Sequence, residues 1–497
     1  MKRYLRINEK DNVGVALADE GLKAGETVEI GGNKLTLIND IARGHKFALN
    51  DIREGEEAVK YGFPIGVATK DIRAGEWAHT HNLRTELADD MQYEYHPRVG
   101  KAGACDSGIK IMGYPRKGGQ MGIRNELWII PTVGCVNAQA KLIADSLKQS
   151  MCFDGVDDVR AFSHNYGCSQ LGDDHENTRK ALADLAMHPN AGGALVLGLG
   201  CENNQISALK EEMEGYDPER VRFLVAQDVE DEVEEGIKLC KELIRKMRTD
   251  KREPMPISKL RVGLKCGGSD GFSGITANPL VGMFADWLVG QGGSAVLTEV
   301  PEMFGAETIL MDRAVSKEVF DKTVGLINDF KYYFRASGQP IYENPSPGNK
   351  AGGITTLEEK SLGCVQKGGT SAVVDVLRYG ERIRKPGLSL LQAPGNDLVA
   401  ASALGLSGCH MVLFTTGRGT PFGTFVPTIK ISTNTPLYGK KPHWIDYNAG
   451  DMIEGKSGEE ALEGLIRVAA ETADGELANN EKNESKEMAI FKTGVTL

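Results

Sequence analysis

Histidine and lysine side chains near the start of the chain stand at spacings suited to proton transfer. His45 is followed directly by Lys46, just after an Asp-Ile-Ala-Arg-Gly corner at residues 40–44. His79 and His81 are two residues apart, so in a strand both imidazoles would point to one face. Imidazole titrates near neutral pH and is a common ligand of first-row metals, and a neighbouring lysine can anchor a carboxylate. The pattern predicts acid–base chemistry on an anion, with solvated histidines at hairpin ends as the alternative.

A second set of polar side chains follows apolar runs of the chain, at glycine-containing turns. Cys135, Cys168 and Cys201 are separated by 33 residues each time, and each follows a glycine. The same placement recurs further along the chain, at Cys266, Glu299, Asn396, Asp397 and Arg418. Thiolates suit zinc, iron or an iron–sulfur cluster, but no CxxC pair is present, which argues against a zinc ribbon. The pattern predicts a polar pocket rimmed by thiols, carboxylates and amides; small side chains buried in tight turns are the alternative.

Other motifs carry weaker signals. His175 and His410 fit turn or core positions as well as they fit a site. The glycine-rich loops at 267–271 and 417–420 could hold an anion through backbone N–H groups, and Arg418 could assist. Neither loop matches a nucleotide-binding fingerprint, so a small carboxylate is the simpler ligand. No GxSxG motif is present, which disfavours a serine hydrolase.

The elements that must position these groups form three segments. Residues 1–87 carry short strands and a recurring Asp-Ile-x-x-Gly corner, which predicts a small β-rich domain. Residues 119–250 alternate apolar strands with helical stretches, which predicts βαβ crossovers and a parallel sheet. Residues 258–497 resume that alternation as a second α/β domain. The polar segments 88–118 and 251–257 are expected to be linkers.

Composition excludes several classes of protein. The chain has 497 residues, too many for a single compact domain, and a net charge of −11, which disfavours a nucleic-acid or anionic-membrane surface. Its apolar runs are far shorter than the roughly 20 residues of a membrane span, and no secretory signal is visible. Nine cysteines are too few for a disulfide scaffold, so we expect reduced thiols in a cytoplasmic protein. Glycine is in excess at 60 residues, which predicts many turns where backbone approaches a ligand.

Longer motifs resemble a known family, the altronate/galactarate dehydratases. They comprise His45-Lys-Phe-Ala, Gly-Cys-Ser-Gln-Leu-Gly-Asp-Asp-His at 167–175, Gly-Leu-Gly-Cys-Glu-Asn-Asn at 198–204, Cys-Gly-Gly-Ser-Asp-Gly at 266–271, Asn-Pro-Ser-Pro-Gly-Asn-Lys at 344–350, Lys-Ser-Leu-Gly-Cys at 360–364 and Thr-Gly-Arg-Gly-Thr-Pro at 416–421. The resemblance covers essentially the whole chain. It implies an α/β protein in which a small N-terminal SAF (β-clip-like) domain precedes two α/β domains with mainly parallel sheets.

The resemblance also implies a chemistry. It implies a hydro-lyase of hexuronate catabolism that removes water from D-altronate to give 2-dehydro-3-deoxy-D-gluconate, with Fe²⁺, or sometimes Mn²⁺, as the expected metal. We hypothesise that proton transfer and carboxylate binding come from the small domain, through His45, Lys46, His79 and His81. The candidate substrate-binding residues are Asn82, Asn203, Asn349, Lys350 and Arg418. The candidate metal ligands are Cys266, Asp270, Glu299, Cys364, Cys409 and His410.

Alternatives remain open at this stage. The substrate could be galactarate or another 2-hydroxy acid such as sulfolactate. In a different class, the chain could be a sugar-acid sensor, which binds its ligand without catalytic groups. An iron–sulfur cluster is a less favoured cofactor than a single Fe²⁺. The expected partner is a small sugar acid, and neither a nucleic acid nor a membrane is expected. A homo-oligomer is compatible with the sequence, which does not fix the number of subunits.

Overall fold

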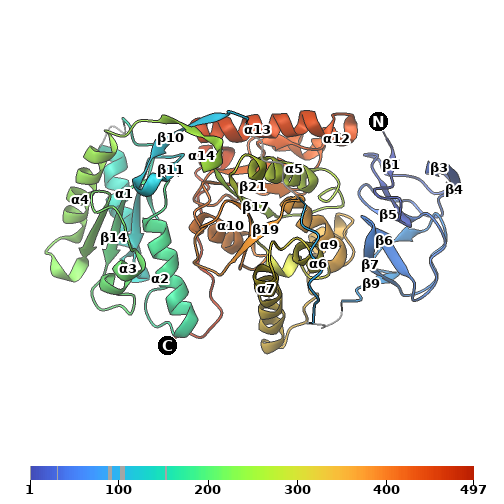
Figure 1. Cartoon of the computed structure of the whole chain (residues 1–497), viewed down its shortest axis with the longest axis horizontal. Helices are drawn as coiled ribbons and strands as arrows, with labels where there is room; N and C mark the ends of the chain where they lie inside the picture. The colour runs from blue at the N-terminus through green and yellow to red at the C-terminus, as the bar shows by residue number, and fades with distance from the viewer. Residues whose placement is uncertain (1, 31, 88–91, 101–106, 151–153) are drawn as a thin grey trace.

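The computed structural model describes residues 2–30, 32–87, 92–100, 107–150 and 154–497. Three lobes lie in a row (Figure 1). The N-terminal strands form one end, the segment that carries Cys135, Cys168 and Cys201 forms the other, and the C-terminal α/β body lies between them. The β-rich first lobe and the two parallel sheets confirm the expected fold class. In the described residues no helix is long and apolar enough to cross a membrane.

The N-terminal lobe is built from short antiparallel strands. Aspartates of the recurring corners bind backbone amides of partner corners: Asp51 accepts from Ala74 N at 2.8 Å, and Asp71 accepts from Glu54 N at 2.9 Å. Because each corner is tied to another, short strands suffice to define the lobe. Its sheets have the orders β1-β2-β5-β8, β6-β7-β9 and β3-β4. The strands are β1 (Tyr4–Leu5), β2 (Val13–Ala16), β3 (Thr27–Ile30), β4 (Asn33–Thr36), β5 (Lys46–Ala48), β6 (Glu57–Lys60), β7 (Phe63–Ala68), β8 (Trp77–Ala78) and β9 (Leu83–Arg84).

The second lobe is a parallel sheet of order β13-β12-β14-β15 with helices on both faces. Alternate residues of β12 serve opposite faces: Leu127 and Ile129 pack with α1 and α4, whereas Trp128 and Ile130 pack with α2. The strands are β12 (Glu126–Pro131), β13 (Val159–Ala161), β14 (Ala191–Gly198) and β15 (Val221–Val225). The helices are α1 (Asn137–Ser150), α2 (Gly172–Ala186), α3 (Ile206–Glu212) and α4 (Glu232–Met247).

The central body is a seven-stranded parallel sheet of order β19-β20-β18-β17-β21-β22-β23. Met411 and Leu413 of β21 pack in the core that holds α5, and Val412 and Phe414 pack in the core that holds α10. The strands are β17 (Arg261–Cys266), β18 (Ser294–Leu297), β19 (Val373–Leu377), β20 (Gly387–Leu391), β21 (Met411–Thr416), β22 (Thr428–Ser432) and β23 (Tyr447–Asn448). The helices are α5 (Ala277–Gly290), α6 (Glu307–Met311), α7 (Lys317–Ala336), α8 (Pro347–Ala351), α9 (Leu357–Cys364), α10 (Asp397–Leu406), α11 (Thr435–Lys440), α12 (Asp451–Glu454), α13 (Gly458–Asp474) and α14 (Asn479–Lys482).

The two segments expected to be linkers carry strands. β10 (Lys110–Pro115) pairs antiparallel with β16 (Glu253–Pro256) and with β11 (Met121–Gly122) in a small sheet between the lobes. The sequence did not reveal these strands because both segments are polar, as expected for a surface ribbon that buries few side chains. The chain therefore enters and leaves the second lobe along one paired ribbon.

Arg124, just before β12, ties the second lobe to the C-terminal helices. Its guanidinium donates to both carboxylate oxygens of Glu481, at 2.8 and 2.7 Å, and to the carbonyl of Thr472 at 2.8 Å. Both charged side chains are almost completely buried. Removing one partner would leave the other charge buried without compensation, which is far more costly than loss of an exposed pair.

We expect Arg124→Ala to lower the free energy of unfolding by about 3–5 kcal/mol in urea titrations. The control is Arg3→Ala, which breaks an exposed pair with Glu20 and should change the same free energy by less than about 1 kcal/mol. Equal, small effects of the two substitutions would show that the buried pair does not hold the lobes together.

Candidate active site

Loops at the carboxyl ends of the central strands converge on one buried region. Cys266 ends β17, and Glu299 and Glu302 follow β18 in a short 3-10 turn at Val300–Glu302. Residues 393–397 follow β20, and residues 417–419 follow β21. Ligands of open parallel sheets bind in this position, so the topology alone marks this region as the candidate site.

Cys266, Glu302 and Cys364 form a compact group of potential metal ligands. The Cys266 and Cys364 sulfur atoms are 3.3 Å apart, and Cys364 Sγ lies 3.1 Å from a Glu302 carboxylate oxygen. The three ligand atoms all lie within 4.8 Å of one another, and all three residues are buried. One ion bound at about 2.0–2.3 Å from each atom would span that separation. Two sulfurs and a carboxylate suit iron or zinc better than magnesium.

Three buried lysines surround this Cys266–Glu302–Cys364 group. Lys360 binds Glu302 at 2.8 Å, and Lys367 donates to Cys266 Sγ at 2.9 Å and to Glu299 at 2.8 Å. Lys265 also contacts Glu299. The hydrogen bond with Cys266, together with burial, raises the pKa of the Cys364 thiol well above its usual range. A metal ion must displace that proton to bind, so the affinity for metal should rise with pH.

Two glutamates in this region have different roles. Burial alone would raise the pKa of Glu302, but the charges of Lys360, Lys265 and Lys367 outweigh it and lower the pKa to about 2. Glu302 is therefore ionised and able to serve as a metal ligand. Glu299 is held in the left-handed region at φ 71°, an uncommon conformation for a non-glycine residue. Its oxygens accept from Lys265, Lys367 and Cys266 N, so it acts as the counter-ion of two lysines.

The N-terminal lobe contributes a second buried charge cluster. Lys46 Nζ and Lys60 Nζ each lie 2.8 Å from a different oxygen of Glu359, and all three side chains are essentially inaccessible. Burial lowers the pKa of Lys46 to about 8 despite its contact with Glu359, and repulsion from Lys60 acts in the same direction. Burial alone would raise the pKa of Glu359, but the two lysines outweigh it and lower it to about 2.

A hydrogen-bonded chain leads from this cluster to a histidine. Lys46 Nζ donates to Thr355 Oγ1 at 2.7 Å, and Thr355 Oγ1 lies 3.0 Å from His79 Nδ1. We infer that the Thr355 hydroxyl donates to Nδ1, because Lys46 occupies one of the two lone pairs of the threonine oxygen. That leaves the proton of the neutral ring on Nε2 of His79. Burial, followed by the charge of Lys46, lowers the pKa of His79 to about 4.

His45 lies beside His79 but is held at both ring nitrogens. Trp77 Nε1 donates to His45 Nδ1 at 3.3 Å, and His45 Nε2 lies 3.3 Å from the carbonyl oxygen of Ala351. The His45 and His79 ring centroids are 4.9 Å apart. Burial lowers the pKa of His45 as well. Both imidazoles are therefore neutral near pH 7, with their positions set by neighbouring groups.

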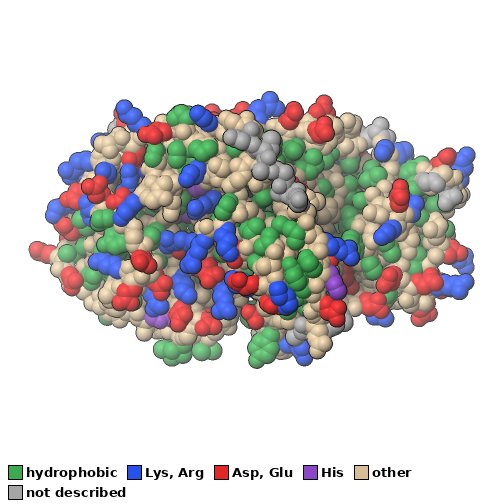
Figure 2. Space-filling view, viewed as in Figure 1, with side chains coloured by type: hydrophobic (Ala, Val, Ile, Leu, Met, Phe, Trp, Pro, Cys, Tyr) green, Lys and Arg blue, Asp and Glu red, His purple; other side chains and the backbone are tan. Residues whose placement is uncertain are grey.

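Helix α9 joins the two clusters. Glu359 faces Lys46 and Lys60 of the first lobe, whereas Lys360 and Cys364 lie one turn apart on the side of Glu302. Glycines allow the lobes to approach: a Cβ on Gly271 or Gly353 would lie 2.1 or 2.3 Å from the carbonyl oxygen of Gly44. A furrow runs along this boundary between the N-terminal lobe and the central body (Figure 2). The histidine and thiol clusters thus flank one interdomain region.

Comparison with known proteins places the chain. An altronate dehydratase of Escherichia coli (strain K12) is 57% identical over 496 residues, which cover 100% of both chains. The chain belongs to the altronate/galactarate dehydratase family. Three family models match it: the SAF domain at 2–86, the second domain of D-galactarate dehydratase/altronate hydrolase at 113–248, and the C-terminal D-galactarate/altronate dehydratase domain at 257–496.

Two further relatives in this family differ in their distance from the chain. An altronate dehydratase of Bacillus subtilis (strain 168) is 56% identical over 499 residues and covers 100% of both chains. A galactarate dehydratase (L-threo-forming) of Escherichia coli (strain K12) is 33% identical over 487 residues, with 93% of this chain and 90% of the relative covered.

Several predicted site residues of this family member lie near the interdomain region. Asn349 is buried, donates to the Ser269 carbonyl at 2.8 Å and accepts from Lys360 at 3.3 Å, so it positions that lysine. Lys350 is half-buried next to it on α8. Arg418 is exposed, with its backbone N–H on the carbonyl of Gly268 at 2.9 Å. Lys350 and Arg418 thus stand near the loop that follows Cys266, from two different segments.

Asp270 lies in the same loop but has a structural role. Its carboxylate accepts from the Thr433 hydroxyl at 3.0 Å and from the Phe272 amide at 3.1 Å, which ties the loop to the end of β22. Burial raises the pKa of Asp270. Its oxygens are occupied by these donors, and it is not part of the Cys266–Glu302–Cys364 group.

Three other predicted site residues are not brought to this region, and a fourth, Asn82, lies beside His79 with its side chain bound to the backbone. Cys409 and His410 precede β21, at the amino end of the sheet, where His410 Nδ1 accepts from Arg261 N at 3.1 Å. Asn203 is in the second lobe, bound to the amide of Ser169 at 2.8 Å. Asn82 is buried in a turn, where it accepts from His79 N and donates to the Trp77 carbonyl. Each of these side chains is occupied by local structure.

His81, the second member of the His79/His81 pair, is exposed on the outer side of Trp77. Its ring centroid lies 4.8 Å from that of the indole, and burial lowers its pKa. The strand expected to align the two imidazoles ends at Ala78, so both histidines lie in a turn.

Buried lysines and their partners were missed at the sequence level. They are Lys60, Lys265, Lys360 and Lys367 with Glu302 and Glu359. Thr355, which contacts Lys46 and His79, and Trp77, which donates to His45, were missed as well. Lysine is ordinarily a surface residue, so no pattern in one sequence marks it as buried. A signal for Glu302 did exist, because it lies one turn after Glu299 at the end of a strand.

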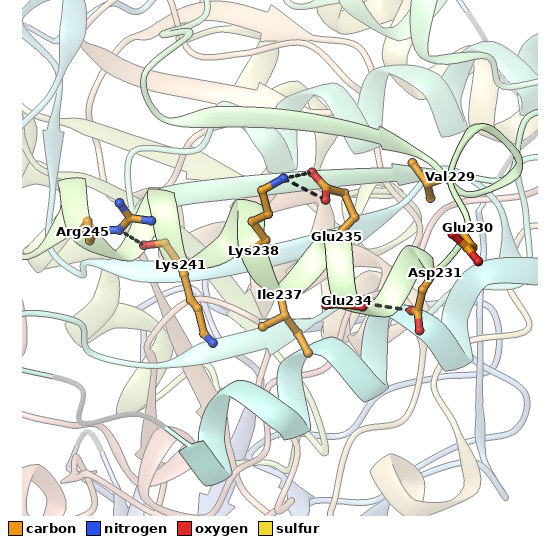
Figure 3. Close-up of a pocket in the computed structure, with 9 residues that line it drawn as sticks. All are labelled: Val229, Glu230, Asp231, Glu234, Glu235, Ile237, Lys238, Lys241 and Arg245. Atoms are coloured by element: carbon orange, nitrogen blue, oxygen red, sulfur yellow. Dashed lines mark hydrogen bonds and ion pairs between the residues drawn. The ribbon is translucent and has the colours of Figure 1, made fainter.

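A hollow of about 1020 Å³ along α4 is a separate feature. Figure 3 shows charged side chains along the solvent side of this helix, where Lys238 pairs with Glu235 at 3.0 Å and Arg245 bonds the Lys241 carbonyl. These are the contacts of an amphipathic surface helix. The hollow holds no thiol, histidine or buried charge that could serve the chemistry expected here.

Proposed function

We propose that this chain is a hydro-lyase that removes water from D-altronate to give 2-dehydro-3-deoxy-D-gluconate. The observation that carries the proposal is its 57% and 56% identity, over full length, to two altronate dehydratases. Identity to the galactarate dehydratase is only 33%, which favours altronate as the substrate. Cys266 and Cys364 are free cysteines at the site, and free thiols are typical of a reducing compartment, which supports a cytoplasmic enzyme.

The interdomain region offers the groups that this reaction needs. The C2 proton is hard to remove because charge builds on the carboxylate oxygens, and cationic side chains stabilise that charge. A divalent metal held by Cys266, Glu302 and Cys364, Fe²⁺ in this proposal with Mn²⁺ as the substitute, would supply a Lewis acid worth several kcal/mol. Lys350 and Arg418 hold the substrate carboxylate and hydroxyls at the mouth of the region.

Proton transfer is assigned to the small lobe. In the net reaction the C2 proton and the C3 hydroxyl leave together as one water molecule. The Nε2–H of neutral His79 has no hydrogen-bond partner among the described residues, so it can donate a hydrogen bond to the departing C3 hydroxyl. Glu359, Lys46 and Thr355 hold His79 in that tautomer. His45, between Trp77 and the Ala351 carbonyl, fixes the wall of the site next to it.

Metal removal and a substrate panel test the proposal. We expect chelator-treated protein to lose activity on D-altronate and to recover it with Fe²⁺, less with Mn²⁺ and least with Mg²⁺. The 2-keto product should form from altronate at least tenfold faster than from galactarate or sulfolactate. Tight binding of altronate with no 2-keto product, with or without metal, would instead identify a sugar-acid sensor.

A further inference from the structure

Three exposed cysteines gather at one edge of the second lobe, outside the site described above. Cys135 follows β12, Cys168 follows the neighbouring β13, and Cys201 follows the other neighbour, β14. All three therefore lie at the carboxyl ends of adjacent parallel strands. The chain passes from β12 to β13 on one side and from β14 to β15 on the other, so the connections diverge between β12 and β14. Open parallel sheets bind ligands at such a switch point.

The three turns that carry these cysteines are locked to one another. Gly134 N donates to the Tyr166 carbonyl at 2.9 Å, and Asn204 N donates to the Gly167 carbonyl at 3.0 Å. Gly167 approaches the end of β12 so closely that a Cβ would lie 2.0 Å from the Thr132 carbonyl oxygen. Only glycine fits there. Gly134 and Gly167, each next to a cysteine, and Asn204, three residues after Cys201, are thus placed against a neighbouring turn, which ties together the three turns that carry the thiols.

The central turn is also conformationally unusual. Ser169, directly after Cys168, has φ 60°, a left-handed conformation rare for a non-glycine residue. The Asn203 side chain accepts from its amide at 2.8 Å, and Leu497 N donates to its carbonyl at 2.8 Å. Left-handed residues that the surroundings hold in place cluster at ligand-binding turns. The strain therefore marks the same turn that presents a thiol.

Exposure separates these cysteines from two others. Cys240 and Cys409 are buried in cores, as free cysteines usually are, whereas Cys135, Cys168 and Cys201 face solvent. Packing therefore does not account for the three exposed thiols. Thiolates are ligands for iron, zinc and iron–sulfur clusters.

We propose that Cys135, Cys168 and Cys201 hold an iron–sulfur cluster in the second lobe. The three sulfur atoms are not all within 4.8 Å of one another, whereas thiolates on one tetrahedral ion at about 2.3 Å lie only about 3.8 Å apart. A cluster places several iron atoms between its cysteines and spaces them more widely. With only three protein thiolates, a cubane cluster keeps one iron open to water or a small anion. This inference does not rest on the proposed dehydratase activity.

Anaerobic reconstitution of the full chain with a mixture of ferric and ferrous iron and with sulfide tests the proposal. We expect a broad absorption band near about 400 nm, with acid-labile sulfide in proportion to the bound iron. Cys135→Ser, Cys168→Ser and Cys201→Ser should each lose at least about three quarters of the band. Two controls should keep it: Cys240→Ala, a buried thiol of the same lobe, and Cys266→Ser, in the other thiol site.

A second measurement covers variants that fail to fold. In the unmodified chain, the reconstituted cluster should protect Cys135, Cys168 and Cys201 from alkylation, and removal of iron should expose them. A band that survives in the three serine variants, or that is lost in Cys266→Ser alone, overturns the assignment. So does a colourless protein that binds zinc at these cysteines, or one that retains no metal.

Discussion

Glu302→Gln is expected to lower kcat on altronate by about 10²–10⁴-fold, because it removes the anionic ligand of the Cys266–Glu302–Cys364 group. A Lewis acid contributes several kcal/mol to such a reaction, and each 1.36 kcal/mol corresponds to a factor of ten in rate. The substitution also leaves the Lys360 ammonium, 2.8 Å from that carboxylate, without its counter-charge. A cation should then bind much less tightly.

Metal content distinguishes this explanation from a general loss of structure. Cys266→Ser and Cys364→Ser should lose metal and turnover together, because each removes a sulfur of the pair 3.3 Å apart. Cys409→Ala is the matched control: a buried thiol of the same sheet at its opposite end, which should retain both properties. If Glu302→Gln kept full metal content and normal kcat, the group would not be the metal centre.

The sequence predicted a site at the carboxyl ends of strands, and its candidate metal ligands included Cys266 and Cys364, which the structure brings together with Glu302. Their role as metal ligands stays a prediction. What the sequence lacked was the pairing in space. These two residues are 98 positions apart, and they meet only because α9 is packed beside the end of β17. Cys409 and His410 have the same residue types but precede their strand. Whether a residue follows or precedes its strand therefore decides, more than its residue type, whether it reaches the site.

Electrostatics limited the prediction further. A lysine in a single sequence is expected to be exposed, yet Lys46, Lys265 and Lys367 are completely buried. Each is stabilised by a glutamate from a distant element, and only the folded topology brings the two together. His45 and His79 were predicted because their residue types suggested acid–base chemistry. Thr355, which sets the tautomer of His79, could not be found, since nothing in its local sequence refers to residue 79.

His79→Ala should lower kcat by about 10²–10⁴-fold while leaving the fold intact, because it removes the group proposed to hydrogen-bond the departing hydroxyl. Its partner in the sequence motif is the control: His81→Ala, exposed outside Trp77, should change kcat less than about threefold. Thr355→Val removes the hydroxyl that faces Nδ1 at 3.0 Å and should lower kcat with little change in KM, whereas Thr355→Ser should restore it. Equal activity of all four variants would show that the contacts between Lys46, Thr355 and His79 do not serve the reaction.

The pH dependence of kcat/KM tests the same contacts between Lys46, Thr355 and His79. His79 must be neutral for its Nδ1 to accept from Thr355, so activity should be lost as pH falls through its pKa of about 4. The charge of Lys46 contributes to that low value. Lys46→Met removes the charge but leaves Glu359 paired with Lys60, so the buried cluster stays balanced. The pKa of His79 should then rise, and the acid limb of kcat/KM should move to higher pH. An acid limb that stays in place, or moves lower, would show that Lys46 does not act through His79.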